Sequence, residues 1–280
     1  MIVIKSPIDL EILLNKIRGN NKKIGFVATM GALHDGHISL IKRSKEENDT
    51  TVCSIFINPK QFNDSNDLEK YPRPIENDLI LLKEVGADIV FLPDYSDIYP
   101  QNYIEPEINL SGLDKVLEGL IRPGHFKGVA LVVKRLFECV NPDVAYFGQK
   151  DYQQTLVIKE IVRQFKIPSV IAVCSIFREK NGLAMSSRNI RLSAEQRERA
   201  SFIYKMLLQL KEDVKSLPLK EALNKAENIL LKNEGVQIDY LTIVNQQTLV
   251  PEETLNLGKS SVALVVVDYF GVRLLDNIYL

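Results

Sequence analysis

The chain has 280 residues, of which 45% are hydrophobic and 25% are charged, a composition that is ordinary for a globular protein. Its 35 basic and 36 acidic residues give a net charge of −1, which disfavours nucleic acid as a partner. The N-terminal segment "MIVIKSPIDLE" lacks the apolar core of a signal peptide and the longest apolar runs have only the length of a strand, so we expect a cytoplasmic protein with no membrane partner.

Short apolar runs alternate with amphipathic helical patterns over the first two-thirds of the chain. The predicted strands lie at 2–4, 24–28, 51–57, 89–92, 144–147 and 170–174. Helical patterns separate them, for example "HISLIKRSKEEN" after the second strand and "DYQQTLVIKEIVRQF" after the fifth. Several strands are continuously apolar, as expected when helices cover both faces of a sheet. The pattern predicts an α/β fold with a Rossmann-like, doubly wound parallel sheet.

The sequence pattern changes after residue 175. Two charged helices are predicted, in "SAEQRERASFIYKMLLQLKEDVKSL" and "PLKEALNKAENILLKNEG", and they are followed by the strand-like runs "VQIDYLTIV", "SVALVVVDYF" and "VRLLDNIYL". Helices followed by strands predict a smaller α+β domain. We therefore expect one domain at 1–175 and a second at 176–280.

Two of the three histidines, His34 and His37, lie three residues apart in "ATMGALHDGH", where the second strand turns into a helix. Ligands of open α/β sheets bind at the carboxyl ends of strands, where helix N-termini favour anions. Gly36 lets a ligand approach the backbone closely. Two imidazole donors here suit a phosphate that gains charge as it is attacked. The alternative is a pair of solvated turn histidines, and zinc is disfavoured because further Cys or His ligands are not nearby.

Other polar clusters follow predicted strands or lie near the domain boundary. In "FGQKDYQQ", Lys150 can reach a phosphate and Asp151 is a candidate N-cap. In "GLAMSSRNIRLS", the Arg188 guanidinium can hold two phosphate oxygens at once. After the third strand, Asn58 and Gln61 are neutral amides that can recognise a small hydroxy acid. Ordinary turns are the alternative interpretation of each cluster.

The remaining histidine and the cysteines carry weaker signals. His125, in "RPGHF", is either a loop residue with a structural hydrogen bond or part of a pocket rim. Cys53, Cys139 and Cys174 are widely separated, and we expect them to be buried and reduced, without a metal or disulfide role.

The HxGH pattern, with a lysine loop and a Ser-Ser-Arg loop downstream, resembles the nucleotidyltransferase superfamily that includes class I aminoacyl-tRNA synthetases. Further segments resemble one family within this superfamily, and they occur in the same order and spacing as in that family: "TMGALHDGHISLI", "NPKQF", "YPR", "GADIVFLP", "LEGLIRPGHFKGV", "PDVAYFGQKDYQQ", "GLAMSSRN" and "DYLTIVN". Over essentially its whole length, the chain resembles the pantothenate synthetase (pantoate–β-alanine ligase) family.

This resemblance implies an ATP-dependent ligase of pantothenate and coenzyme A biosynthesis. The carboxylate of (R)-pantoate would attack the α-phosphate of ATP, supplied with Mg²⁺, to give pantoyl adenylate and pyrophosphate. The amine of β-alanine would then displace AMP to give pantothenate. The family also implies a homodimer.

The resemblance implies roles for individual residues as well. His37 would be the proton donor, with His34, Lys150 and Arg188 as further catalytic groups. The implied ATP-binding residues are Met30, Gly31, Ala32, Leu33, His34, Asp35, Gly36, His37, Gly148, Gln149, Lys150, Asp151, Phe177, Met185, Ser186, Ser187 and Arg188. The implied substrate-binding residues are Gln61, Gln154, Asn58 and Tyr71.

The chain departs from the family pattern at several positions. Ala28 replaces a usual proline, and Gln149 replaces a frequent glutamate. Asn77 precedes Asp78 where some relatives have paired aspartates near magnesium. The protein ligands of the metal are therefore unknown, and the ATP phosphates are expected to hold it.

Other functions compete with the ligase. A related nucleotidyltransferase would transfer AMP to a phosphate acceptor and would not need β-alanine. A nucleotide-binding protein without catalysis would be expected to lack His37, Lys150 or Arg188, and all three are present. A tRNA-aminoacylating enzyme would need positive charge and an anticodon-binding region. Because residues 185–188 lie near the domain boundary, we expect the C-terminal domain to act as a lid that excludes water from the adenylate.

Overall fold

The computed structural model describes residues 1–63, 65–254 and 260–280. The chain divides into two compact units. The first comprises Met1–Gly148 and Gln153–Cys174, and the second comprises Gln149–Tyr152 and Ser175–Leu280. The sequence-based division assigns nucleotide binding to 1–175 and a lid to 176–280, and that functional assignment stays a prediction.

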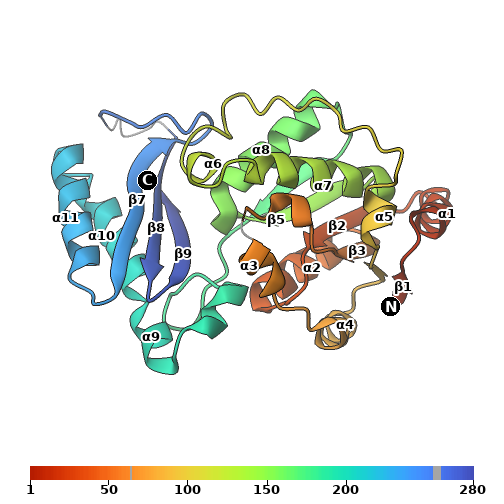
Figure 1. Ribbon diagram of the computed structural model, residues 1–280, viewed down its shortest axis with the longest axis horizontal. Helices are drawn as coiled ribbons and strands as arrows, with labels where there is room; N and C mark the ends of the chain where they lie inside the picture. Colours follow the sequence, from red (N-terminus) through yellow and green to blue (C-terminus); the bar gives the residue numbers. More distant parts are fainter. Residues whose placement is uncertain (64, 255–259) are drawn as a thin grey trace. The chain divides into compact units, whose positions relative to one another are not determined.

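A six-stranded parallel sheet forms the centre of the first unit (Figure 1). In spatial order its strands are β1 (Ile2–Ile4), β4 (Ile89–Phe91), β3 (Thr50–Ile55), β2 (Ile24–Thr29), β5 (Val144–Gly148) and β6 (Val170–Cys174). From β2 the chain proceeds to β3 and β4 on one side, and it then returns to β5 and β6 on the other. The neighbours β2 and β5 therefore form the switch point, where sheets of this kind bind ligands. The predicted Rossmann-like, doubly wound α/β fold is confirmed.

Helices cover both faces of this sheet (Figure 1). Those on one face are α1 (Pro7–Arg18), α7 (His125–Val140) and α8 (Tyr152–Gln164), and those on the other are α2 (Asp35–Glu47) and α4 (Ile75–Glu84). Consecutive strand residues point to opposite faces, so Phe26 packs in the first layer and Val27 in the second. The continuously apolar strands follow from this double coverage.

Short helical segments connect the larger elements. They are α3 (Ser65–Glu69), α5 (Tyr95–Ile98) and α6 (Glu118–Ile121), with the 3₁₀ turns η1 (Pro59–Gln61), η2 (Gln149–Asp151) and η3 (Ser187–Arg191). The turn η1 follows β3 after three intervening residues, and η2 begins directly after β5. Segments that follow the carboxyl ends of strands are where open parallel sheets bind ligands.

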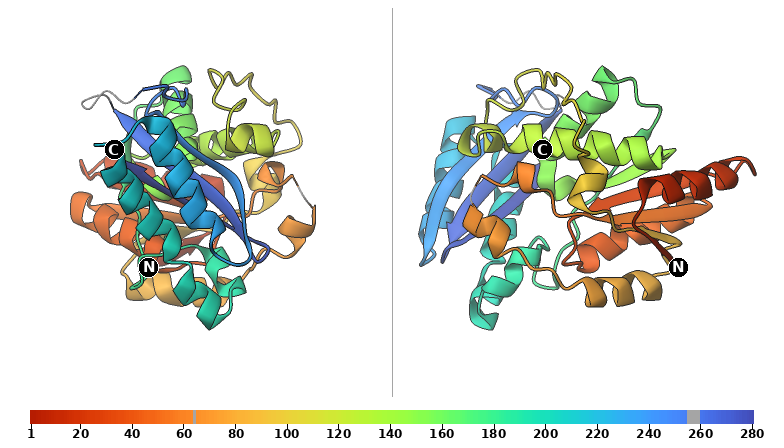
Figure 2. Two further views of the ribbon diagram at one scale, coloured as in Figure 1. Left: turned by 90° about the vertical axis from the view of Figure 1, so that its left-hand side faces the viewer. Right: turned by 45° about the vertical axis from the view of Figure 1, so that its right-hand side comes forward.

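The second unit contains an antiparallel sheet of order β7-β8-β9. Its strands are β7 (Val236–Asn245), β8 (Ser261–Tyr269) and β9 (Val272–Tyr279). The helices α10 (Phe202–Asp213) and α11 (Leu219–Leu231) cover one face of this sheet (Figure 2). Leu207 and Val265 lie together in the resulting core. The predicted α+β character of this part of the chain is confirmed.

The first helix predicted in the second unit is in fact two helices. The helix α9 (Ala194–Arg199) ends at Arg199 with Ala200 as its C-cap, and α10 begins at Phe202 after its N-cap Ser201. Ser193 caps α9 reciprocally with Gln196, as the capping-box spacing indicates. The helical pattern continues across the break, so hydrophobic periodicity alone does not reveal it.

The cysteines are free thiols, and two of them, Cys53 and Cys174, are buried. The expectation of burial is wrong for Cys139, which is only half-buried at the margin of the first core near the end of α7. Burial raises the pKa of Cys53 to about 12 and that of Cys139 to about 11. Both thiols therefore stay protonated at neutral pH.

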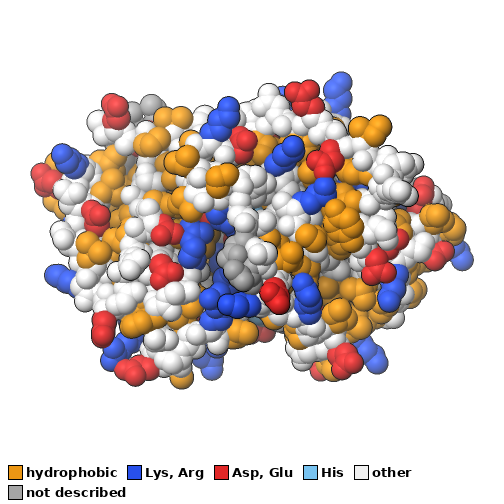
Figure 3. Space-filling view, in the orientation of Figure 1, with side chains coloured by type: hydrophobic (Ala, Val, Ile, Leu, Met, Phe, Trp, Pro, Cys, Tyr) orange, Lys and Arg blue, Asp and Glu red, His pale blue; other side chains and the backbone are white. Residues whose placement is uncertain are grey.

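Basic and acidic side chains lie interspersed over the face shown in Figure 3. This mixture agrees with the net charge of −1. Within the described residues, no helix combines the length and the apolar character needed to cross a membrane.

Candidate functional site

The loop between β2 and α2 starts at the carboxyl end of a central strand. The Thr29 hydroxyl donates to the Ser54 carbonyl (2.7 Å) and accepts from the Gly31 N–H (3.2 Å), which fixes the exit of the strand. Gly31 and Ala32 have positive φ angles of 78° and 50°. A Cβ atom at Gly31 would lie 2.9 Å from Asp78 Oδ2. Glycine is therefore required there both by φ and by space.

His34 and His37 form a reciprocal cap at the N-terminus of α2. His34 Nδ1 accepts from the Gly36 N–H (3.1 Å), and His37 Nδ1 accepts from the His34 N–H (3.3 Å). The ring centroids lie 4.0 Å apart. A neutral imidazole whose Nδ1 accepts a hydrogen bond carries its proton on Nε2. Each histidine is then a donor through Nε2 at a helix N-terminus, an arrangement that suits a phosphate.

Asp78, on α4, supports the same loop. Its side chain is fully buried, and its carboxylate accepts from the Ala32 N–H (2.9 Å) and the Leu33 N–H (2.8 Å). Burial raises the pKa of Asp78, and the two hydrogen bonds oppose that rise. The sequence alone suggests Asp78 only as a residue near magnesium. In the structure it is instead a hydrogen-bond acceptor for the backbone of the loop between β2 and α2.

Replacing Asp78 with alanine is expected to lower the free energy of unfolding by about 2–4 kcal/mol. The reason is that two buried N–H groups lose their acceptor, and each unsatisfied group costs about 1–3 kcal/mol. Urea denaturation measures the change. The exposed neighbour Asn77 provides the control, because Asn77→Ala should change stability by less than about 0.5 kcal/mol. A loss below about 1 kcal/mol for Asp78→Ala would contradict this support role.

The amides Asn58 and Gln61 lie in one hydrogen-bond network at the end of β3. Asn58 is fully buried, and its Nδ2 donates to Gln61 Oε1 (3.2 Å) and to the Gly128 carbonyl (3.0 Å). Asn58 Oδ1 accepts from the Tyr99 hydroxyl (3.1 Å). Gln61 Nε2 donates to Met30 Sδ (3.0 Å), which brings a predicted substrate residue against a predicted ATP residue. Asn58 thus orients Gln61, and its direct contact with substrate stays a prediction.

His125 begins α7 beside this network and is 8% exposed. Its Nδ1 is hydrogen-bonded to the Gln61 carbonyl (2.7 Å), and its Nε2 lies 3.2 Å from Arg122 Nη1. The structure shows the hydrogen bond that the first alternative for His125 expects, but His125 is the first residue of α7 rather than a loop residue, and its place at a pocket rim stays a prediction. Through this hydrogen bond, His125 fixes the main chain that carries Gln61.

The other two predicted substrate residues also belong to the first unit. Tyr71 is buried and packs edge-to-face against Phe62, with ring centroids 5.7 Å apart. Gln154 is half-buried in the first turn of α8. Their contact with substrate stays a prediction.

The lysine loop follows β5 directly. Gly148 ends that strand in the first unit, and η2 (Gln149–Asp151) belongs to the second. Lys150 Nζ donates to Asp151 Oδ1 (3.3 Å), and the Lys150 side chain is 18% exposed. Asp151 immediately precedes α8, which is the position of an N-cap, and its capping role stays a prediction.

The Ser-Ser-Arg segment of the second unit follows a small hairpin. Met185 N–H donates to the Phe177 carbonyl (3.0 Å), so two predicted ATP residues are brought together. Ser186 then caps η3, because its Oγ accepts from the Arg188 N–H (3.3 Å). Asn189 Nδ2 donates to the Ala184 carbonyl (3.1 Å) and ties the turn back to the hairpin.

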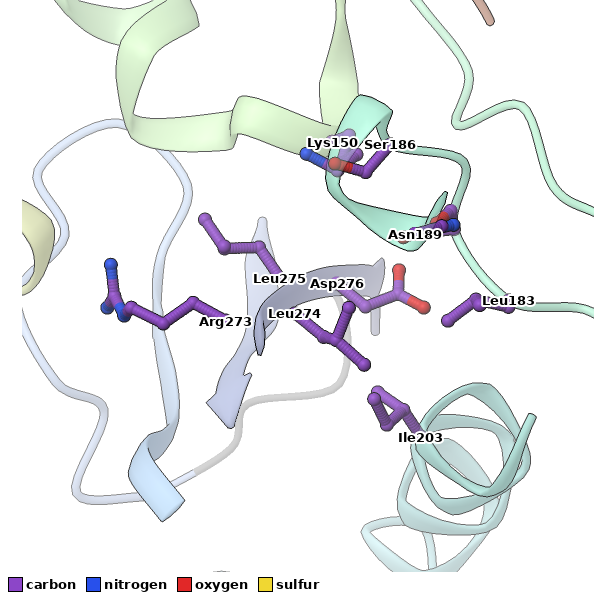
Figure 4. A pocket seen from close by; sticks show the side chains of 10 residues that line it. Lys150, Leu183, Ser186, Asn189, Ile203, Arg273, Leu274, Leu275 and Asp276 are labelled. Carbon is purple, nitrogen blue, oxygen red and sulfur yellow. The ribbon is translucent and has the colours of Figure 1, made fainter. Parts of the chain in front are cut away.

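A small cavity in the second unit joins the lysine loop to this turn (Figure 4). Lys150, Ser186 and Asn189 line it together with Asp276 of β9. In Figure 4 the Asp276 carboxylate points from the strand toward the segment that carries Leu183 and Asn189. Neither Asp276 nor its neighbour Asn277 stands out in the sequence, because both lie within a strand-like run.

The side chains of the described residues do not form a fitting magnesium site. Among the described residues, no group of three or more His, Cys, Asp or Glu side chains could hold a metal ion. Both oxygens of Asp78, the acidic candidate, accept from backbone N–H groups. That the ATP phosphates hold the magnesium ion stays a prediction.

Comparisons with known proteins agree with this geometry. The family model described as pantoate-beta-alanine ligase matches residues 2–279. A pantothenate synthetase of Bacteroides fragilis is 44% identical over 278 residues, which are 99% of this chain and 98% of that protein. A pantothenate synthetase of Cytophaga hutchinsonii is 44% identical over 281 residues, with 99% of each chain covered.

Solved structures of the same family are also similar to this chain. The pantothenate synthetase of Thermus thermophilus superposes with a TM-score of 0.91 at 38% identity and covers 99% of both chains. The pantoate-beta-alanine ligase of Francisella tularensis, complexed with beta-gamma ATP and beta-alanine, superposes with a TM-score of 0.80 at 38% identity. That comparison covers 100% of this chain and 97% of the other.

Proposed function

Because the chain belongs to the pantoate–β-alanine ligase family, we propose that it condenses (R)-pantoate with β-alanine to give pantothenate, with ATP as the second substrate. A carboxylate is a poor electrophile toward an amine, so the acid must first acquire a better leaving group. Transfer of AMP to the carboxylate supplies that group. The reaction then proceeds through pantoyl adenylate.

In the first step, a pantoate carboxylate oxygen forms a bond to the α-phosphorus of MgATP, and the bond to pyrophosphate breaks. Negative charge grows on the phosphate oxygens as this happens. His34 and His37 donate through Nε2 to these oxygens, and the N-terminus of α2 adds its dipole. What supports this assignment is the reciprocal cap, which holds both rings in the donor tautomer.

Lys150 and Arg188 carry the positive charge that the triphosphate requires. Lysine acts on phosphate as a point charge, and arginine can hold two oxygens at once. Met30 to His37, Gly148 to Asp151, Phe177 and residues 185–188 contribute the remaining ATP contacts. A magnesium ion would enter with ATP, held by its phosphates, and would neutralise part of their charge.

In the second step, the β-alanine nitrogen forms a bond to the acyl carbon of the adenylate, and the bond from that carbon to the phosphate oxygen breaks. AMP leaves, and the nitrogen gives up its extra proton to solvent. Gln61 and Gln154 bind pantoate, and Gln61 also contacts β-alanine. Neutral amides suit this task because they orient the acid without adding charge. The support for Gln61 is its fixed place in the network of Asn58, His125 and Met30.

The assembly, location and motion of the protein are proposed on the same family basis. We propose a cytoplasmic homodimer, which light scattering at micromolar concentration would test. Residues 176–280 are proposed to act as a lid. Hydrogen exchange at 185–189 that does not change when ATP and pantoate are added would contradict the lid.

The observation that carries the function is the family match over residues 2–279 in a chain that retains the histidine cap and the lysine and Ser-Ser-Arg loops. The test is to incubate the protein with MgATP, pantoate and β-alanine and to identify the products by mass. Pantothenate and AMP are expected in equal amounts. Formation of ADP, or transfer of AMP to a phosphate acceptor without a need for β-alanine, would show a different reaction.

A further inference from the structure

Two consecutive polar residues of β9, Asp276 and Asn277, are almost completely buried. They are 4% and 2% exposed. The strand β9 lies at the edge of its sheet, so one of its sides is not paired with another strand. Buried polar groups are costly unless they are hydrogen-bonded, and the partners of these two residues therefore matter.

The Asn277 amide is hydrogen-bonded to the lysine loop. Its Nδ2 donates to the carbonyl of Gln149 (3.0 Å) and to that of Lys150 (3.1 Å). Its Oδ1 accepts from Gln149 Nε2 (3.0 Å). These bonds hold two successive peptide groups, so one side chain sets the path of the main chain from which the Lys150 side chain extends.

Asp276 holds the other loop through an arginine. Its carboxylate accepts from Arg178 Nη1 (2.6 Å) and Nη2 (2.9 Å) in a bidentate pair. Arg178 Nη1 also donates to the Gly182 carbonyl (3.1 Å), and the guanidinium lies 3.6 Å from the centre of the Tyr204 ring. The guanidinium is thereby fixed in plane and direction.

The segment that Arg178 anchors is the hairpin before the Ser-Ser-Arg turn. Arg178 pairs with Ala184 in an antiparallel bridge, and the Glu179 N–H donates to the Leu183 carbonyl (2.8 Å). The chain passes from Ala184 to Ser186 within two residues. A shift of Arg178 would therefore displace the turn that presents residues 186–188.

We propose that Asp276 and Asn277 are positioning residues for the ligase reaction. Asn277 sets the main chain of Lys150, and Asp276 sets residues 186–188 through Arg178. In this role they act through Lys150 and Arg178 rather than by contact with ATP. The inference rests on the proposed function, because that function assigns the phosphates to Lys150 and Arg188. One dipeptide thus fixes two phosphate-binding loops that are distant in the sequence.

Stability alone is a weak reason for this arrangement. Replacing a buried ion pair with apolar residues of similar size is often neutral or stabilising, whereas removing one partner leaves a costly unpaired charge. The double variant Arg178→Met/Asp276→Leu therefore separates the two roles. It removes both charges together and keeps most of the buried volume.

The experiment compares three full-length variants with the natural protein. The first is Arg178→Met/Asp276→Leu, and the second is Asn277→Asp, which keeps the acceptor for Gln149 but loses both donors. The third is the control Val272→Ala, which shortens a buried side chain of the helix-facing core at the other end of β9. Thermal unfolding, kcat/KM for ATP, KM for β-alanine and hydrogen exchange are measured for each.

Both test variants are expected to lose about 10–100-fold in kcat/KM for ATP, because small displacements of binding groups have effects of this size. Their KM for β-alanine should stay within about twofold. Hydrogen exchange should rise at 149–151 in Asn277→Asp and at 177–188 in the double variant. Val272→Ala should melt at a lower temperature and keep its kcat/KM for ATP. If Asn277→Asp does not fold, Asn277→Ala takes its place.

A double variant that folds and retains the natural kcat/KM for ATP would overturn the proposal for Asp276, and the same result with Asn277→Asp would overturn it for Asn277. Failure of the proposed function is recognised separately, because the natural protein would then form no pantothenate. Hydrogen exchange still tests the positioning role in that case, because it does not depend on activity. Unchanged exchange in both loops would overturn the positioning role.

Discussion

His37→Ala is expected to lower kcat/KM for pantothenate formation by about 10²–10³-fold. The variant loses the Nε2–H donor that meets the charge growing on the α-phosphate, and removal of one such donor typically has an effect of this size. It also removes the acceptor for the His34 N–H, which loosens the cap of α2. Steady-state kinetics with saturating β-alanine measure the loss.

Two further substitutions at His37 separate the donor from the cap. In His37→Asn the side-chain oxygen can replace Nδ1 as acceptor for His34, but no donor reaches the Nε2 position. Its activity should therefore be as low as that of His37→Ala, with greater thermal stability. In His37→Gln the side-chain nitrogen lies near the Nε2 position, and activity should recover in part. Near-natural turnover of His37→Ala would remove His37 from the mechanism.

Lys150→Met is the second change with a large expected effect, a loss of about 10²–10³-fold in kcat/KM for ATP. Methionine preserves much of the apolar stem that packs in the cavity of the second unit, so the change removes mainly the charge. Loss of a cation that clamps a transferring phosphoryl group belongs to the same class of effect as loss of an oxyanion donor. Pantoate-dependent kinetics with ATP varied measure it.

The exposed Lys159 on α8 provides the matched control. Lys159→Met also removes one positive charge, and it should leave kcat/KM for ATP within about twofold. Equal effects of the two substitutions would show that only net charge matters. A loss of less than about threefold in Lys150→Met would contradict the phosphate role of Lys150.

The sheet of the first unit was predictable because its signal is local. Buried parallel strands are apolar on both faces, so a run such as 24–28 can be recognised as a strand without knowing which strands lie beside it in the sheet. Six such runs separated by helices leave few arrangements other than a doubly wound sheet. The division between α9 and α10 was not predictable, because the helical pattern continues through Ala200 and Ser201.

The candidate site shows the same contrast between local and long-range signals. His34 and His37 are three residues apart, so their common place at a helix N-terminus follows from the sequence alone. The bonds from Asp78 to the Ala32 and Leu33 N–H groups span 46 and 45 residues. The hydrogen bonds from Asn277 to the carbonyls of Gln149 and Lys150 join residues that are 128 and 127 positions apart in the sequence. No spacing rule reveals such partners, since only the folded chain brings them together.

The central claim is that pantoate is activated by transfer of AMP before β-alanine takes part. Exchange of labelled pyrophosphate into ATP tests this claim most directly. The exchange needs only the first step, running forward and in reverse, and it does not need the second step. We predict exchange that depends on pantoate and proceeds without β-alanine. Protein that forms pantothenate but catalyses exchange only when β-alanine is present would contradict it.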